Sequence, residues 1–312
     1  MISDERRVLV TGANGQIGLQ LLARLHELGL RARALVRSER AAGMLEAIPE
    51  SMRPEIRIAD PRDPEALGLA AEGCDQAVHL IGILKEGATT SYHDAHEATC
   101  GALAQAAAAC GLERIVYLSI FGADPGSQNE CLASKGRAEE ILCAGKVPAT
   151  VLRIPMVIGA DDPASRALRA QAQKGWLPLV GGGTTLHQPL DARDLLRAIL
   201  ACLACLDDTS GTASRFDLGG PECLSQRDLV RRAAALYGNT PRIVTIPRFV
   251  VHSLAAVLEK TSANPPVTRA MLGVLEHDDR IDSREALKAL GLQLTPLDET
   301  LQRFIGPEAS LG

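Results

Sequence analysis

The chain has 312 residues, with 33 Lys and Arg against 38 Asp and Glu, for a formal net charge of −5. Hydrophobic residues at 46% and charged residues at 23% exclude intrinsic disorder, because that much apolar side chain can form a core. The mild acidity and the 3% of aromatic residues argue against a nucleic-acid binder. We find no membrane-spanning run and no signal peptide, so we expect a cytoplasmic protein with reduced cysteines.

Short apolar runs alternate with helical segments from residue 7 to about residue 155. Each run is apolar or β-branched throughout, which is typical of a parallel strand buried on both faces. Residues 17–29 between the first two runs have helical spacing of apolar residues, and Asp63 with Pro64 resembles a helix start. The alternation predicts an α/β fold with a parallel sheet and helices on both faces. The expected strands are residues 8–12, 32–36, 56–59, 77–82, 115–120 and 150–154.

The second half of the chain is less regular. It contains a glycine turn at 181–183, a possible strand ending near Leu190, and a helix from about 192 to 206. A further helix is predicted after Ser225, because Asp228 follows at the spacing of a capping box. We therefore expect residues 1–155 to form one domain. Residues 156–312 are expected to form a smaller C-terminal α/β lobe, interleaved with the last strands of the sheet.

The first expected strand leads into a glycine-rich turn, TGANGQIG, and then into a helix. Gly12 permits the tight turn, Gly15 lets the backbone approach a pyrophosphate, and Gly18 lets the helix pack close to the strand. The free amides at the helix start attract phosphates. The motif predicts dinucleotide binding, with a glycine turn that holds no ligand as the alternative. The loop residues expected at the cofactor are Gly12, Asn14, Gly15, Gln16, Ile17 and Gly18.

The G-x-x-G-x-x-G spacing and the later x-x-x-Lys site resemble the extended and atypical short-chain dehydrogenase/reductase superfamily, whose fold is a Rossmann-type doubly wound sheet. Within it, the chain most resembles the NAD(P)-binding accessory subunit of respiratory complex I and its bacterial relatives. The matching stretches are IRIADPRDPEAL, HLIGILKEG, LRIPMVIG with Pro155, HQPLD and FDLGGPECLSQRDLV.

The resemblance also implies where the rest of the cofactor lies. Asp60 and Pro61 are expected beside the adenine, although Asp60 could instead only cap the following turn. Leu80, Ile81 and Gly82 are expected to line the ribose side of the cofactor. The resemblance further suggests a respiratory-chain protein as partner, and through it a peripheral position at the inner membrane.

The residues after the second expected strand bear on the choice of cofactor. NAD-selective folds place a carboxylate there for the ribose 2′-hydroxyl, whereas this chain has Arg37 and Ser38. An arginine fork pairs with a 2′-phosphate, Ser38 can donate a hydrogen bond, and Arg40 could supply a second cation. We predict NADP(H) in preference to NAD(H). The same residues also read as a solvated helix start with Ser38 as its N-cap.

The expected catalytic pair is altered. Active family members use Tyr-x-x-x-Lys on one helix face, where the lysine lowers the tyrosine pKa and binds the nicotinamide ribose. This chain has Lys135, but Cys131 stands at the tyrosine position. A cysteine sulfur lies one bond beyond Cβ and falls short of the place of a phenol oxygen. The usual mechanism is therefore in doubt, whereas a cofactor role for Lys135 is not.

Two other side chains could contribute to catalysis. Tyr92 lies in the loop after the fourth strand and could reach the substrate side. Ser119, at the end of the fifth strand, is the hydroxyl available for the family's Ser/Thr position, and a strand-end cap is an equal alternative. Tyr117 is expected in the core.

Three weaker signals have plain structural explanations. Cys202 and Cys205 have metal-ligand spacing, but we expect a buried pair of small residues in a helix. His93 and His96 are expected at a solvated helix end. The apolar segment 249–258 is expected to pack in the core of the second lobe, although it could dock a partner or a membrane surface.

The sequence therefore predicts an NADP(H)-binding protein whose chemistry is weak, non-standard or absent, with an accessory, assembly or redox-sensing role. The alternative is an active oxidoreductase or epimerase-like enzyme that acts on a small carbonyl or sugar-type molecule.

Overall fold

The structure, a computed structural model, describes residues 6–204, 213–262 and 264–308. The chain divides into two compact units, each built from separated stretches. The first unit comprises residues 1–83, 90–153 and 196–216. The second comprises residues 84–89, 154–195 and 217–312.

The first unit is built on a seven-stranded sheet. Its strands are β1 (Arg7–Thr11), β2 (Arg31–Val36), β3 (Glu55–Ile58), β4 (Gln76–His79), β5 (Arg114–Ile120), β6 (Ala149–Ile154) and β11 (Ser214–Asp217), in the order β11-β6-β5-β4-β1-β2-β3. β1 pairs in parallel with both β2 and β4, so the chain reverses its direction of travel across the sheet beside β1. Such a switch point leaves a crevice at the carboxyl ends of the strands, where ligands bind.

Helices cover both faces of this sheet, which confirms the predicted Rossmann-type α/β fold. They are α1 (Gln16–Glu27), α2 (Glu39–Glu46), α3 (Pro64–Ala71), α4 (Thr99–Cys110), α5 (Glu130–Cys143) and α7 (Ala192–Ala204), with short turns at η1 (Glu50–Met52) and η2 (His93–Ala98). All six strands expected from the sequence are present. Asp63 caps α3, as expected, by accepting hydrogen bonds from the amides of Glu65 and Ala66.

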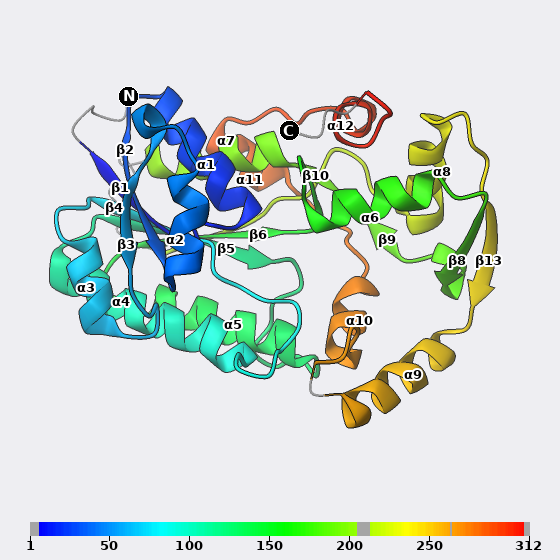
Figure 1. The fold of residues 1–312 in the computed structure, drawn as a ribbon, viewed down its shortest axis with the longest axis horizontal. Helices are drawn as coiled ribbons and strands as arrows, with labels where there is room; N and C mark the ends of the chain where they lie inside the picture. Colours follow the sequence, from blue (N-terminus) through cyan, green and yellow to red (C-terminus); the bar gives the residue numbers. More distant parts are fainter. Residues whose placement is uncertain (1–5, 205–212, 263, 309–312) are drawn as a thin grey trace. The chain divides into compact units, whose positions relative to one another are not determined.

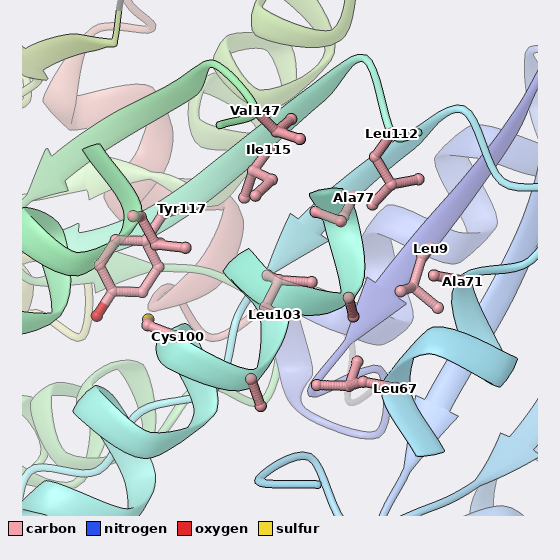
Figure 2. Packing of buried hydrophobic residues seen from close by; sticks show 14 of the residues in the cluster. Leu9, Leu67, Ala71, Ala77, Cys100, Leu103, Leu112, Ile115, Tyr117 and Val147 are labelled. Carbon is pink, nitrogen blue, oxygen red and sulfur yellow. The ribbon is translucent and has the colours of Figure 1, made fainter. Parts of the chain in front are cut away.

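The core beneath one face of the sheet is assembled from small and aliphatic side chains. Leu103 of α4 belongs to one cluster with Leu67 of α3 and with Leu9 and Ile115 of the strands, and α3, α4 and α5 lie along that side of the sheet (Figures 1 and 2). Tyr117 belongs to the same cluster, beside Cys100, which confirms its expected place in the core (Figure 2). The alanines of α4 let that helix pack closely.

The second unit contains short strand pairs and helices. Its strands are β7 (Val157–Ile158), β8 (Trp176–Val180), β9 (Leu186–His187), β10 (Leu190–Asp191), β12 (Leu224–Ser225) and β13 (Arg242–Ile246), with a glycine turn η3 (Gly181–Gly183). Its helices are α6 (Pro163–Ala172), α8 (Gln226–Ala235), α9 (Arg248–Thr261), α10 (Arg269–Leu275), α11 (Arg284–Leu290) and α12 (Leu297–Phe304). Ser225 caps α8 as expected, because its hydroxyl accepts from the amide of Asp228. The sequence did not predict the parallel pair β8–β13.

One expectation about the second unit is wrong. Segment 249–258 was expected to pack in a core, but it forms part of α9, in which only Ala255 is buried. Phe249 is 72% exposed and Leu254 and Val257 are each 57% exposed. Apolar composition alone cannot show whether a helix has a partner on each side. Within the described ranges, no helix combines the length and hydropathy needed to cross a membrane.

Candidate functional site

The glycine-rich turn joins the carboxyl end of β1 to the start of α1. Gly12 has a φ of +68°, which a residue with a side chain rarely adopts, and its carbonyl accepts from the amide of Gly15 at 3.0 Å. A Cβ on Gly18 would lie 2.6 Å from the carbonyl oxygens of Gly12 and Ala13. The loop can therefore fold onto the helix start only because Gly18 has no side chain.

This turn has the features of an anion site. The first amides of α1 have no acceptor within the helix, and its first turn carries no acidic residue. Asn14, Gln16 and Ile17 are partly exposed around it, and Gly15 is exposed. A Cβ on Gly12 would contact the backbone of Leu80 and Ile81 at 3.1 and 3.2 Å, so the turn lies directly beside the end of β4.

The ends of β2 and β3 carry polar side chains at the same edge of the sheet. Arg37 is exposed, and Ser38 caps α2 by accepting from the amide of Ala41 at 3.3 Å. Asp60 accepts from the Arg62 guanidinium at 2.7 Å and from the Arg62 amide at 3.0 Å, so it closes the turn that Pro61 continues. These bonds to Arg62, together with the charge of Arg37, lower the pKa of Asp60.

Lys135 lies on α5, on the face turned toward the sheet. Its Nζ donates to the carbonyl of Leu118 at 3.0 Å and lies 4.6 Å from the centre of the Tyr117 ring. The residue is 7% exposed, and burial lowers the pKa of its ammonium group. A Cβ on Gly82 would lie 2.9 Å from this Nζ. Since Gly82 is itself exposed, its missing side chain leaves the ammonium within reach of a ligand at the end of β4.

Cys131 is one helical turn before Lys135. Asn129 caps α5 and accepts a hydrogen bond from the amide of Cys131 at 3.0 Å, which fixes the backbone of Cys131 in the first turn of the helix. The Cys131 sulfur donates to the carbonyl of Ile83 at 3.5 Å, and the residue is 1% exposed.

The Ser119 hydroxyl bonds to a buried ion pair. It donates to the carboxylate of Glu139 at 2.6 Å, and Glu139 is 1% exposed. Arg153 and Arg215 approach the same carboxylate at 2.6 and 3.4 Å. Two cations therefore compensate the buried charge.

A family model described as NAD(P)H-binding matches residues 12–178, a stretch that contains the glycine turn, the ends of β2 to β5 and Lys135. This chain belongs to the NAD(P)H-binding family. The geometry agrees, because the first amides of α1 have no acceptor within the helix, and the Lys135 ammonium of α5 lies beside Gly82, after the end of β4.

Relatives support a placement among the atypical short-chain dehydrogenase/reductase proteins. The mitochondrial NADH dehydrogenase [ubiquinone] 1 alpha subcomplex subunit 9 of Arabidopsis thaliana is 28% identical over 297 residues, which is 92% of this chain and 73% of the relative. A ceramide reductase of Caulobacter vibrioides is 25% identical over 264 residues, 84% of this chain and 81% of the relative. The predicted resemblance to the complex I accessory subunit is confirmed.

Solved structures share the fold. UDP-glucuronic acid 4-epimerase from Bacillus cereus, in complex with UDP-glucuronic acid and NAD, superposes with a TM-score of 0.71 at 16% identity. The match covers 96% of this chain and 98% of that chain.

The residues after β4 include a histidine whose role the sequence did not indicate. His93 is solvated, as expected, with 71% of its side chain exposed, but the same expectation for His96 is wrong. His96 is fully buried, and its Nε2 accepts a hydrogen bond from the amide of Ile83 at 3.1 Å. Burial, aided by the charge of Lys135, lowers the pKa of His96 to about 3, so the ring is neutral. Tyr92 is buried, and its ring stacks on that of His96 with 5.7 Å between the ring centres.

A second buried histidine lies under the glycine turn. The Thr11 hydroxyl is 2.7 Å from Nδ1 of His79, and the Thr99 hydroxyl is 3.2 Å from Nε2. Thr99 donates its proton to the carbonyl of Ala95, so we assign the His79 proton to Nε2 and the role of acceptor to Nδ1. Burial, with the charge of Lys135, lowers the pKa of His79 to about 3. This chain of bonds holds Thr11 just before the turn.

The remaining candidates are Cys202, Cys205 and Pro155. Cys202 is buried in α7, and Cys205 lies outside the described residues. In the part of the chain that the structure describes, no three His, Cys, Asp or Glu side chains converge as a metal site would require. Pro155 belongs to the second unit, directly after β6.

Proposed function

We propose that this chain binds NADP(H) along the carboxyl edge of the first unit's sheet. The amides at the start of α1 would hold the pyrophosphate, next to Gly12 and Gly15. Asp60 and Pro61 would border the adenine. Leu80 and Ile81 would border the ribose near the nicotinamide, with Lys135 donating to its hydroxyls past Gly82.

The preference for NADP(H) is supported by Arg37. Its exposed guanidinium follows β2, where an NAD-selective fold has a carboxylate. The Ser38 hydroxyl accepts from the amide of Ala41, so its own proton is available for a phosphate oxygen. An arginine and a hydroxyl match the charge and the acceptors of a 2′-phosphate.

We further propose that the chemistry is weak, non-standard or absent. A bound nicotinamide ring gives or takes a hydride, but the protein must supply the proton donor. At the tyrosine position, the chain offers Cys131, a buried thiol bonded to the carbonyl of Ile83, and this observation carries the proposal. The cofactor would then serve an accessory, assembly or redox-sensing role. The relatives named as NADH dehydrogenase subunits suggest a respiratory-chain partner and a peripheral position at a membrane.

An active reductase or epimerase-like enzyme is the second candidate. It is favoured by the ceramide reductase that aligns with 84% of this chain. Its proton donor would be Tyr92, Cys131 or a bound water, with Ser119 as the family's hydroxyl.

Calorimetric titration with NADPH and NADH tests the cofactor assignment. We expect NADPH to bind more tightly. Arg37→Ala should weaken NADPH binding about tenfold or more and leave NADH binding unchanged, because a charge-assisted bond contributes roughly 1.5–3 kcal/mol. Arg31→Ala is the matched control, since Arg31 begins the same strand at its other end. Equal affinities for the two cofactors, or a preference for NADH, would overturn the assignment.

A panel of carbonyl substrates distinguishes the two functions. Turnover that disappears in Lys135→Ala would favour the enzyme. The accessory role predicts a silent natural chain, copurification with respiratory-chain subunits, and a gain of reductase activity in Cys131→Tyr. Cys131→Ser is the control for folding, and it should bind the cofactor as the natural chain does.

A further inference from the structure

The outward face of α9 is apolar. Four large apolar side chains are exposed on this helix, and the opposite side carries Ala255, which is 1% exposed. At about 100° per residue, the four fall within one arc of the helix surface, which the exposed Ser253 and Lys260 share. They are Phe249, Val250, Leu254 and Val257, exposed by 72%, 43%, 57% and 57%. We call this set the α9 face.

Around the α9 face, the cations are more exposed than the acids with which they pair. Glu259, the single acid of the helix, accepts from Arg269 at 2.8 Å, and its side chain is 23% exposed. Glu276, at the end of α10, is 3.2 Å from the ring of His252, with 17% of its side chain exposed. Arg248, at the start of α9, also pairs with Glu276 at 3.9 Å but keeps 53% of its side chain exposed, and Lys260 near the end of the helix is exposed. Residues 242–276 contain four Lys or Arg and two acids, in a chain with a net charge of −5.

We infer that the α9 face docks on the surface of an anionic phospholipid bilayer. An apolar face bordered by cations is the pattern of a helix that lies in the membrane interface, where acyl chains receive the apolar groups and anionic headgroups pair with the cations. The 14 residues of α9 span roughly 21 Å, less than a bilayer core, so the helix lies along the surface. A second copy of the chain would bring like charges together. The inference does not depend on the proposed function.

Flotation with lipid vesicles tests the apolar part. The full chain should float with vesicles of phosphatidylcholine and phosphatidylglycerol in equal parts, and less with phosphatidylcholine alone. Phe249→Ser and Val257→Ser should each weaken partitioning roughly tenfold, because each removes a side chain that the acyl region would bury. Leu69→Ser is the matched control, since Leu69 is 67% exposed on α3 of the other unit. The inference fails if no vesicle binds the chain, or if Leu69→Ser loses as much.

The charge part has its own control. Lys260→Glu should reduce binding to the anionic vesicles, and added salt should do the same to the natural chain. Lys288→Glu makes the same change of charge at an exposed residue of α11 and should have no effect. If the natural chain instead forms a dimer in light scattering, and Val257→Ser makes it monomeric, the α9 face is a self-association surface and the inference is wrong.

Discussion

At the residue scale, the candidate site depends on the contact between Gly82 and Lys135. The ammonium group is buried and donates to the carbonyl of Leu118. Gly82, which is exposed, lies beside it: a Cβ there would come within 2.9 Å of the ammonium nitrogen. The spacing of Lys135 and Cys131 could be read from the sequence, because one helical turn separates them. Their link to Gly82 could not, because it joins residues far apart in the chain.

We predict that Gly82→Ala weakens NADPH binding about tenfold or more, because the added Cβ would lie 2.9 Å from the Lys135 ammonium and displace it. The melting temperature should change little, since the displaced group is the end of a flexible side chain. Titration calorimetry and thermal melting measure the two effects. Gly87→Ala is the control, because a Cβ there meets nothing within 4 Å. Unchanged affinity in Gly82→Ala would separate Lys135 from cofactor binding.

At the element scale, the first unit was largely predictable and the second was not. Strands β1, β4, β5 and β6 are mostly buried and contain apolar runs, whereas β3, at the edge of the sheet, has no buried residue and was recognised from its place in the strand–helix alternation. In the second unit, β7, β9, β10 and β12 have two residues each, which is too short for a recognisable alternation of apolar and polar residues. The six-residue π-helix η2 does not have α-helical spacing, so the apolar pattern of the sequence could not show that His96 is buried.

The start of α1 provides a prediction at this scale. Gly18→Ala should destabilise the chain by about 1–3 kcal/mol, because its Cβ would lie 2.6 Å from two carbonyl oxygens. Gly101→Ala in α4 meets nothing within 4 Å and should stabilise by roughly 0.5–1 kcal/mol, as alanine does in a helix. Urea unfolding measures both. If Gly18→Ala left the free energy of unfolding unchanged, the turn would not need the close contact between Gly18 and the carbonyls of Gly12 and Ala13.

At the scale of the whole molecule, buried neutral histidines make stability depend on pH. His79 and His96 have pKa values lowered from 6.5 to about 3, so the unfolded chain binds their protons first. The stability they give is complete above pH 6.5 and is lost as the pH falls toward 3. Each should lower the free energy of unfolding by roughly 2 kcal/mol between pH 7 and pH 5.

Urea unfolding at these two pH values tests this. The free energy of unfolding should fall less between pH 7 and pH 5 in His79→Asn and in His96→Asn, by roughly 2 kcal/mol in each variant. This holds whatever the effect of the substitution on stability at neutral pH. His26→Asn changes an exposed ring and should keep the full loss. A variant at either buried position that retains the whole pH dependence would show that its ring is not held neutral in the fold.

The central claim is that the glycine turn binds a dinucleotide. Calorimetry of the purified chain with NADPH measures it most directly. We predict saturable heat at one site per chain, together with a higher melting temperature in the presence of the ligand. If neither NADPH nor NADH gives heat or raises the melting temperature, the turn is a structural feature without a ligand and the account is contradicted.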